Sequence, residues 1–66
     1  MTIKEIANQM AQRCQEMPNV NPAQIFDIYC QHLEKQGADH GAMEHFLHAS
    51  HKALTEKGID TSWLIK

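Results

Sequence analysis

The chain has 66 residues, of which 42% are hydrophobic and 21% charged, and its formal net charge is −2 with the histidines neutral. A chain of this size and apolar content is expected to fold as one soluble domain rather than stay disordered. Its six basic residues are scattered, which disfavours nucleic-acid binding, and no apolar run reaches the roughly 18 residues that a membrane span needs.

The first predicted element is a helix over residues 2–17. Thr2 and Glu5 have the spacing of a capping box, in which each side chain accepts a hydrogen bond from the other residue's backbone amide. Apolar residues then recur at three- and four-residue intervals and form one stripe: Ile3, Ile6, Ala7, Met10, Ala11, Cys14 and Met17. Pro18 disfavours helical geometry at the preceding residue and so ends the helix.

A second helix is predicted over residues 21–36. Asn21 is a favourable N-cap, and Pro22 suits the first helical position because its missing N–H would have no partner there. The apolar stripe of this helix contains Ala23, Ile25, Phe26, Tyr29, Cys30 and Leu33. Gly37 is suited to a left-handed position just beyond the helix, whereas Ile28 lies off the stripe and is expected to face a second surface.

A third helix is predicted over residues 40–57, capped by Asp39. Its apolar face contains Ala42, Met43, Phe46, Leu47, Ser50, Ala53 and Leu54. We expect the hydroxyl of Ser50 to bond back to a helix carbonyl, and Gly58 followed by Ile59 predicts a Schellman ending. The sequence therefore predicts a small all-α domain of three helices with a short C-terminal tail.

The tail is unusually apolar, because Trp63, Leu64 and Ile65 follow one another. Chain ends normally fray unless they dock, and three large apolar groups are unsuited to a segment left in water. Together with Ile28 they are expected to form an interaction surface. The expected partner is another protein or a second copy of the same chain. Alternatively, the tail folds back over the helices as a lid.

The cysteines give no sign of a disulfide framework or a zinc site. Cys14 and Cys30 both fall on apolar helix faces, where they are expected to act as small buried hydrophobes in a reducing compartment. Two cysteines alone do not complete a zinc ligand set. The opening segment lacks the apolar core of a signal peptide, so a cytoplasmic location is expected.

Four of the five histidines fall in the third helix. Glu44, His48 and His51 share one face of that helix and could together bind a divalent metal. Structural zinc sites normally have four ligands in a closed shell, so we expect a solvated polar face with no metal or other cofactor. Protonation of all five imidazoles would raise the formal net charge from −2 to +3, which leaves pH sensing as an alternative.

The residues favour neither DNA binding nor enzymatic activity. The second and third helices could form a helix-turn-helix, but the outer face of the third offers no Arg, Asn or Gln for bidentate base contacts. A DNA-binding regulator therefore stays an alternative to a protein-binding one. The chain has no nucleophile elbow, phosphate-binding glycine loop or C-x-x-C motif, so no enzyme is expected.

Two long segments, the opening MTIKEIANQMAQRCQEM and the later HFLHASHKALTEKGI, are similar to the short accessory proteins encoded in the dispensable early region of lambda-like temperate phages. The resemblance implies a protein made in the cytoplasm of a bacterial host, where it modulates phage development or host physiology by contacting host or phage proteins. It carries over no site residues. The function predicted from the sequence is that of a small non-enzymatic regulatory or adaptor protein that self-associates.

Overall fold

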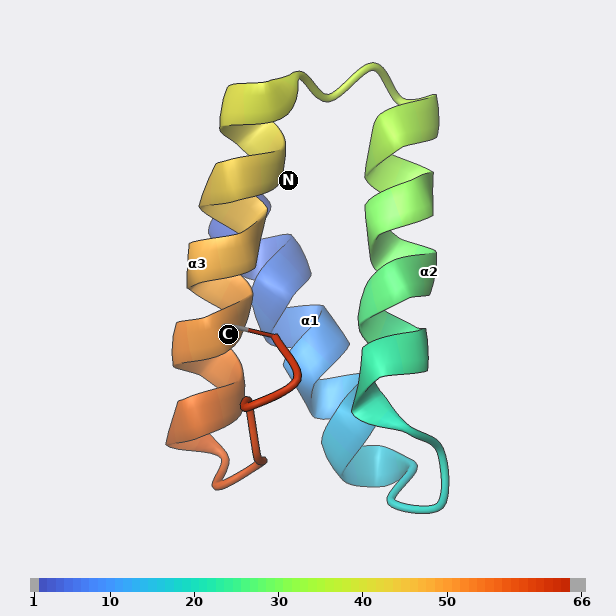
Figure 1. Ribbon diagram of the computed structural model, residues 1–66, viewed down its shortest axis with the longest axis vertical. Coiled ribbons are helices and arrows are strands. Elements are labelled where there is room, and N and C mark those ends of the chain that lie inside the picture. Colours follow the sequence, from blue (N-terminus) through green and yellow to red (C-terminus); the bar gives the residue numbers. More distant parts are fainter. Residues whose placement is uncertain (1, 65–66) are drawn as a thin grey trace.

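Three α-helices make up most of the computed structural model, which describes residues 2–64 (Figure 1). They are α1 (Ile3–Glu16), α2 (Pro22–Lys35) and α3 (His40–Glu56). These bounds differ from the predicted ones by at most one residue at either end. The predicted all-α class with three helices is therefore confirmed.

Each helix begins at the cap that the sequence predicts. The hydroxyl of Thr2 accepts a hydrogen bond from the backbone N–H of Glu5 at 3.2 Å, and the carboxylate of Glu5 accepts one from the backbone N–H of Thr2 at 3.4 Å. The side chains of Asn21 and Asp39 accept bonds of 3.0 and 2.8 Å from the first turns of α2 and α3. These bonds satisfy N–H groups that the helices themselves leave without partners.

The ends of α2 and α3 are set by glycine. Gly37 and Gly58 have φ angles of 89° and 75°, in the left-handed region that a Cβ atom makes unfavourable. At the end of α3, Ile59 donates its backbone N–H to the carbonyl of Leu54 and Gly58 donates to Thr55, both at 3.0 Å. This pair of bonds confirms the predicted Schellman ending, and the same pattern closes α2.

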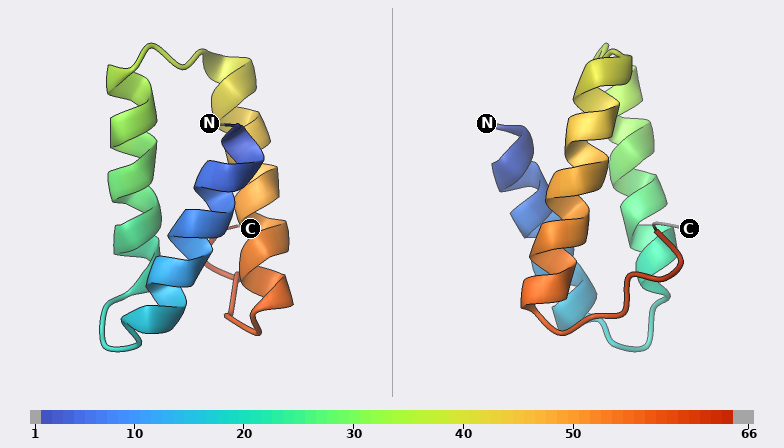
Figure 2. Two further views of the ribbon diagram at one scale, coloured as in Figure 1. Left: turned by 180° about the vertical axis from the view of Figure 1, so that it is seen from behind. Right: turned by 60° about the vertical axis from the view of Figure 1, so that its left-hand side comes forward.

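The helices are unequally packed. The α1 and α3 backbones approach each other closely over much of their length, α1 and α2 approach less, and α2 and α3 least of all. Figures 1 and 2 show α1 lying across one side of the α2–α3 pair, while the chain after α3 returns across the other side. Side chains from all three helices and the tail therefore fill the space between α2 and α3.

The core follows the predicted stripes. The buried apolar residues are Ala7, Met10, Ala11, Cys14, Ile25, Leu33, Phe46, Ala53 and Leu54. Phe26 stacks on Phe46 with ring centroids 5.3 Å apart and an interplanar angle of 11°, which joins α2 to α3. Met17 was expected on the core stripe of the first helix, but it is 37% exposed. That expectation is wrong because Met17 has left helical geometry, with φ −120° and ψ 69°, before Pro18.

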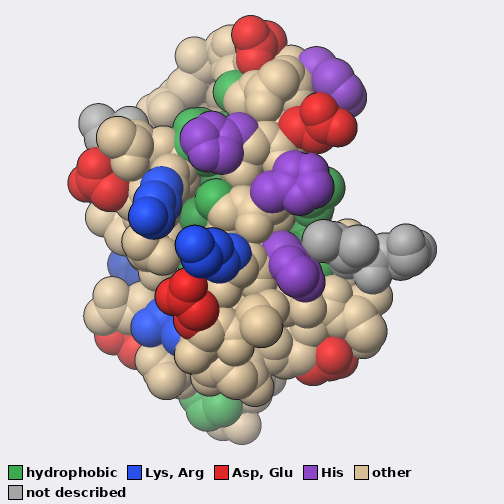
Figure 3. Space-filling view, turned by 90° about the vertical axis from the view of Figure 1, so that its left-hand side faces the viewer, with side chains coloured by type: hydrophobic (Ala, Val, Ile, Leu, Met, Phe, Trp, Pro, Cys, Tyr) green, Lys and Arg blue, Asp and Glu red, His purple; other side chains and the backbone are tan. Residues whose placement is uncertain are grey.

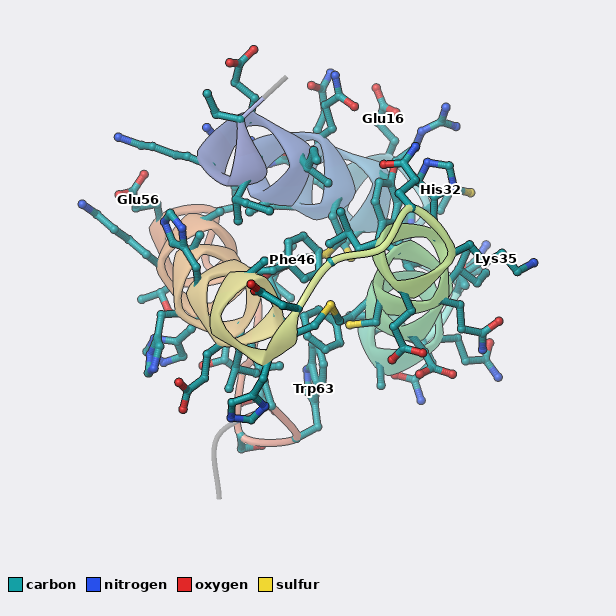
Figure 4. All side chains as sticks on the ribbon, turned by 90° about the horizontal axis from the view of Figure 1, so that it is seen from above. Glu16, His32, Lys35, Phe46, Glu56 and Trp63 are labelled. Carbon is teal, nitrogen blue, oxygen red and sulfur yellow. The ribbon has the colours of Figure 1, made fainter. Side chains whose placement is uncertain are left out.

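The described part of the tail docks onto the helices. The ring of Trp63 packs edge-on against Phe26, with centroids 5.7 Å apart, and its indole N–H donates to the carbonyl oxygen of Asp60 at 2.7 Å. The Asp60 carboxylate accepts hydrogen bonds from the backbone N–H and the hydroxyl of Ser62, at 3.2 and 2.8 Å. Trp63 and Leu64 are half-buried as a result, and Figure 4 shows Trp63 turned toward the space between α2 and α3.

One polar group lies in the core without a partner. Ser50 is fully buried, and its Oγ has no hydrogen-bond partner among residues 2–64. The expected bond back to a helix carbonyl is therefore not made. A buried hydroxyl in this state loses its hydration without compensation, at a cost of about 1–3 kcal/mol.

Replacing Ser50 by alanine should stabilise the protein. The substitution removes the uncompensated hydroxyl and favours the helix, so the free energy of unfolding should rise by about 1 kcal/mol and the melting temperature by about 4–8 °C. Thermal unfolding followed by circular dichroism measures this change. Ser62→Ala is the matched control, because the Ser62 hydroxyl is bonded to Asp60 and its loss should bring no gain. A lower melting temperature for Ser50→Ala would contradict the unpartnered state of the hydroxyl.

Candidate interaction site

An apolar groove of about 350 Å³ lies where the tail meets α2 and α3. It is lined by Ala23, Gln24, Phe26 and Asp27 from α2, Leu47 from α3, and Trp63 and Leu64 from the tail. We call it the tail groove. It is apolar except at Gln24 and Asp27, so it suits an apolar side chain better than a polar ligand.

The aromatic wall of the tail groove is held in place from behind. Phe26 is backed by the fully buried ring of Phe46, and Trp63 is fixed by its edge-on contact with Phe26 and by its hydrogen bond to the Asp60 carbonyl. Phe26 and Trp63 are themselves only half-buried. Two rigid aromatic side chains therefore keep part of their surface available at the groove.

One carboxylate, that of Asp27, lines the tail groove. Asp27 and Glu34 on α2 both lie close enough to Cys30 to affect its thiol. Hydrogen bonds from Ser62 lower the pKa of the Asp60 carboxyl in the tail. Asp27 is therefore the charged side chain that lines an otherwise apolar groove.

The residues expected to form one interaction surface lie in separate places. Trp63 and Leu64 line the tail groove, and Ile65 lies outside the described residues. Ile28 is 65% exposed on α2, roughly 160° around the helix axis from Phe26, since each residue advances by about 100°. Ile28 is therefore an isolated apolar residue on the far side of α2 from Trp63, and isolated apolar residues are common on protein surfaces.

The histidine candidates do not form a ligand set. Figure 3 shows histidine side chains gathered over the outer face of α3. Glu44 and His48 are exposed and His51 is half-buried, but residues 2–64 contain no group of three or more His, Cys, Asp or Glu side chains that could hold a metal ion. The side chains leave successive turns of one helix, and a shared face alone does not bring them to a common point.

Cys14 lies in the core, as expected for a small buried hydrophobe, whereas Cys30 packs against the core and is only partly buried. Cys14 is buried and its Sγ lies 3.6 Å from the sulfur of Met10, while Cys30 is half-buried. Burial raises the pKa of both thiols, and for Cys30 burial and the nearby Asp27 and Glu34 raise it to about 11. Neither thiol is therefore prepared to act as a nucleophile at neutral pH.

Comparisons of this chain with protein-family models, with curated proteins and with solved structures gave no match. No helix within the described residues is long and apolar enough to cross a membrane. The fold and site thus define a small three-helix domain with an apolar groove that the Asp27 carboxylate also lines. The similarity to phage accessory proteins stays a prediction from the sequence.

The raised pKa of Cys30 predicts a loss of stability in alkaline solution. The Cys30 thiol ionises near its ordinary pKa of 9.0 in the unfolded chain but only near 11 in the folded one. The neutral buried thiol therefore makes its full contribution to the free energy of unfolding below pH 9, and this contribution is lost as the pH rises from 9 to 11. Urea unfolding across this range should show stability falling more steeply for the wild type than for Cys30→Ala. An equal fall in stability with pH for the two proteins would contradict the raised pKa of Cys30.

Proposed function

We propose that this chain is a non-enzymatic adaptor or regulatory domain that binds a segment of another protein in the tail groove. The observation that carries the proposal is the half-buried aromatic pair of Phe26 and Trp63, which presents apolar surface in a groove that the Asp27 carboxylate also lines. Aromatic side chains held rigidly in a partly desolvated depression are typical energetic centres of protein interfaces.

The chemistry of the groove indicates the chemistry of the partner segment. Leu47, Leu64 and the two aromatic rings accept an apolar side chain, while Asp27, beside the groove, favours lysine or arginine in the flanking positions. An amphipathic segment with apolar anchors at helical spacing and basic neighbours meets both demands. Charge complementarity of this kind selects the partner and accelerates association.

A protein partner fits the groove better than the alternative of DNA binding. The Asp27 carboxylate repels phosphate groups, and the aromatic pair is flanked by Leu47 and Leu64 rather than by basic side chains. Self-association is a second use of the same surface, because a chain of 66 residues gains much stability from additional apolar burial.

A direct test uses Trp63, which is the only tryptophan of the chain, as a fluorescent reporter. The ligand is a synthetic amphipathic peptide with leucines at helical spacing, lysines elsewhere and no tryptophan. Its binding should shift the emission of Trp63 to the blue, and this shift should saturate as the peptide concentration rises. The Leu64→Ala variant should bind roughly tenfold more weakly, because about 1.5 kcal/mol of apolar contact is removed. Ile28→Ala is the control and should bind normally, since Ile28 faces away from the groove.

A peptide with glutamates in place of the lysines should bind more weakly, because its glutamates meet the Asp27 carboxylate with like charge. Equal binding of the two peptides, or equal weakening by Leu64→Ala and Ile28→Ala, would refute the proposal. Circular dichroism of each variant establishes that the helices are intact.

Self-association is tested separately by sedimentation velocity over a range of protein concentrations. We expect a dimer whose population rises with protein concentration. Trp63→Ala should weaken this dimer and the lysine peptide should dissociate it, because the dimer contact, the substituted side chain and the peptide site all lie at the same apolar surface. A wild-type protein that remains a monomer throughout, with no effect of the substitution, would remove the homodimer from the proposal and leave the groove to a different protein.

A further inference from the structure

A second groove lies on the opposite side of α3, between α3 and α1, and has a volume of about 400 Å³. Nitrogen-bearing side chains converge on it from both helices: Lys4 and Asn8 from α1, and His45, His48 and Lys52 from α3. Figure 3 shows lysine and histidine side chains together over this face of the molecule. We call it the basic groove.

The basic groove exists because small residues lie beneath it. Ala49 and Ala53 on α3 line the space between the two helices and are too short to fill it. Since α1 and α3 are the most closely packed pair of helices, the walls of the groove are held at a fixed separation. The result is a depression with a small apolar floor and polar sides.

The charge of the basic groove is opposite to that of the chain. Two of the six lysine and arginine residues line it, against the single carboxylate of Glu56, although the whole chain has a formal net charge of −2. Lys4, Lys52 and Glu56 together leave one net positive charge. His45 and His48 add two imidazole rings to the same groove.

The donor set indicates the class of ligand. Lysine ammonium groups, an asparagine amide and imidazole N–H groups are all hydrogen-bond donors, and together they suit the several acceptor oxygens of a phosphate group. Two lysines disfavour a metal ion by repulsion, and no cluster of metal ligands occurs in the described chain. The volume falls within the range of small-molecule sites.

We propose that the basic groove binds a small organic phosphate. Lys4 and Lys52 hold the phosphate group from the two sides of the groove, and the carbon skeleton lies over Ala49 and Ala53. His45 and His48 add imidazole N–H donors from the α3 side of the groove.

Phenyl phosphate is a suitable probe, with phenol and inorganic phosphate for comparison. In titrations of the isotope-labelled protein followed by amide NMR shifts at constant ionic strength, phenyl phosphate should perturb the basic groove and saturate, whereas phenol should not. Inorganic phosphate should bind more weakly, because it cannot contact the alanine floor. Equal affinity for phenyl phosphate and inorganic phosphate would refute the organic part of the proposal.

Charge-matched variants separate this site from general attraction to a positive surface. Lys52→Gln should weaken binding roughly fivefold, the upper range for one exposed charge pair, while Lys35→Gln on α2 removes the same charge far from the groove and should change nothing. Equal effects of the two lysine substitutions, or no saturable shift with phenyl phosphate, would overturn the proposal.

Discussion

The stacked rings of Phe26 and Phe46 hold α2 and α3 together, the pair of helices whose backbones approach each other least. The α2 and α3 backbones approach each other little, so side chains must bridge them, and this ring pair does so at a centroid distance of 5.3 Å. Trp63 adds a third ring, edge-on to Phe26, from the side opposite α1. Each such ring buries a large area, and the pair geometry contributes about 0.5–1.5 kcal/mol beyond it.

The docked tail buries only part of its own apolar surface. A 66-residue chain has little core to spare, and the tail supplies part of it through Trp63 and Leu64 rather than presenting them entirely to a partner. What remains is a partly open groove with an aromatic wall and one lining carboxylate, that of Asp27. The tail thus covers part of the core, as the lid alternative predicts, and it also lines the groove that we propose as the interaction site.

The third helix has a different role on each of its two sides. One side carries Leu47 into the apolar tail groove, and the other carries His45, His48 and Lys52 into the basic groove. The two grooves therefore lie on opposite sides of α3, so the two proposed ligands do not compete for the same surface.

The sequence by itself determined the helices, because their signals are local. Caps such as Thr2 and Asp39, and the glycine endings, depend on hydrogen bonds that reach three to five residues along the chain, and apolar periodicity follows from helix geometry alone. These features predicted the all-α class and the bounds of each helix. They also placed most of the core, with Met17 as the exception where the chain leaves the helix.

Only the tertiary structure decided which distant residues meet. Phe26 and Trp63 lie in different segments, and no local pattern specifies that their rings touch or that Ile28 stays apart from them. The basic groove joins Lys4 to Lys52, whose proximity arises from the packing of α1 on α3. Periodicity fixes the face of a helix on which a side chain lies, but its neighbour across a groove depends on how the helices pack.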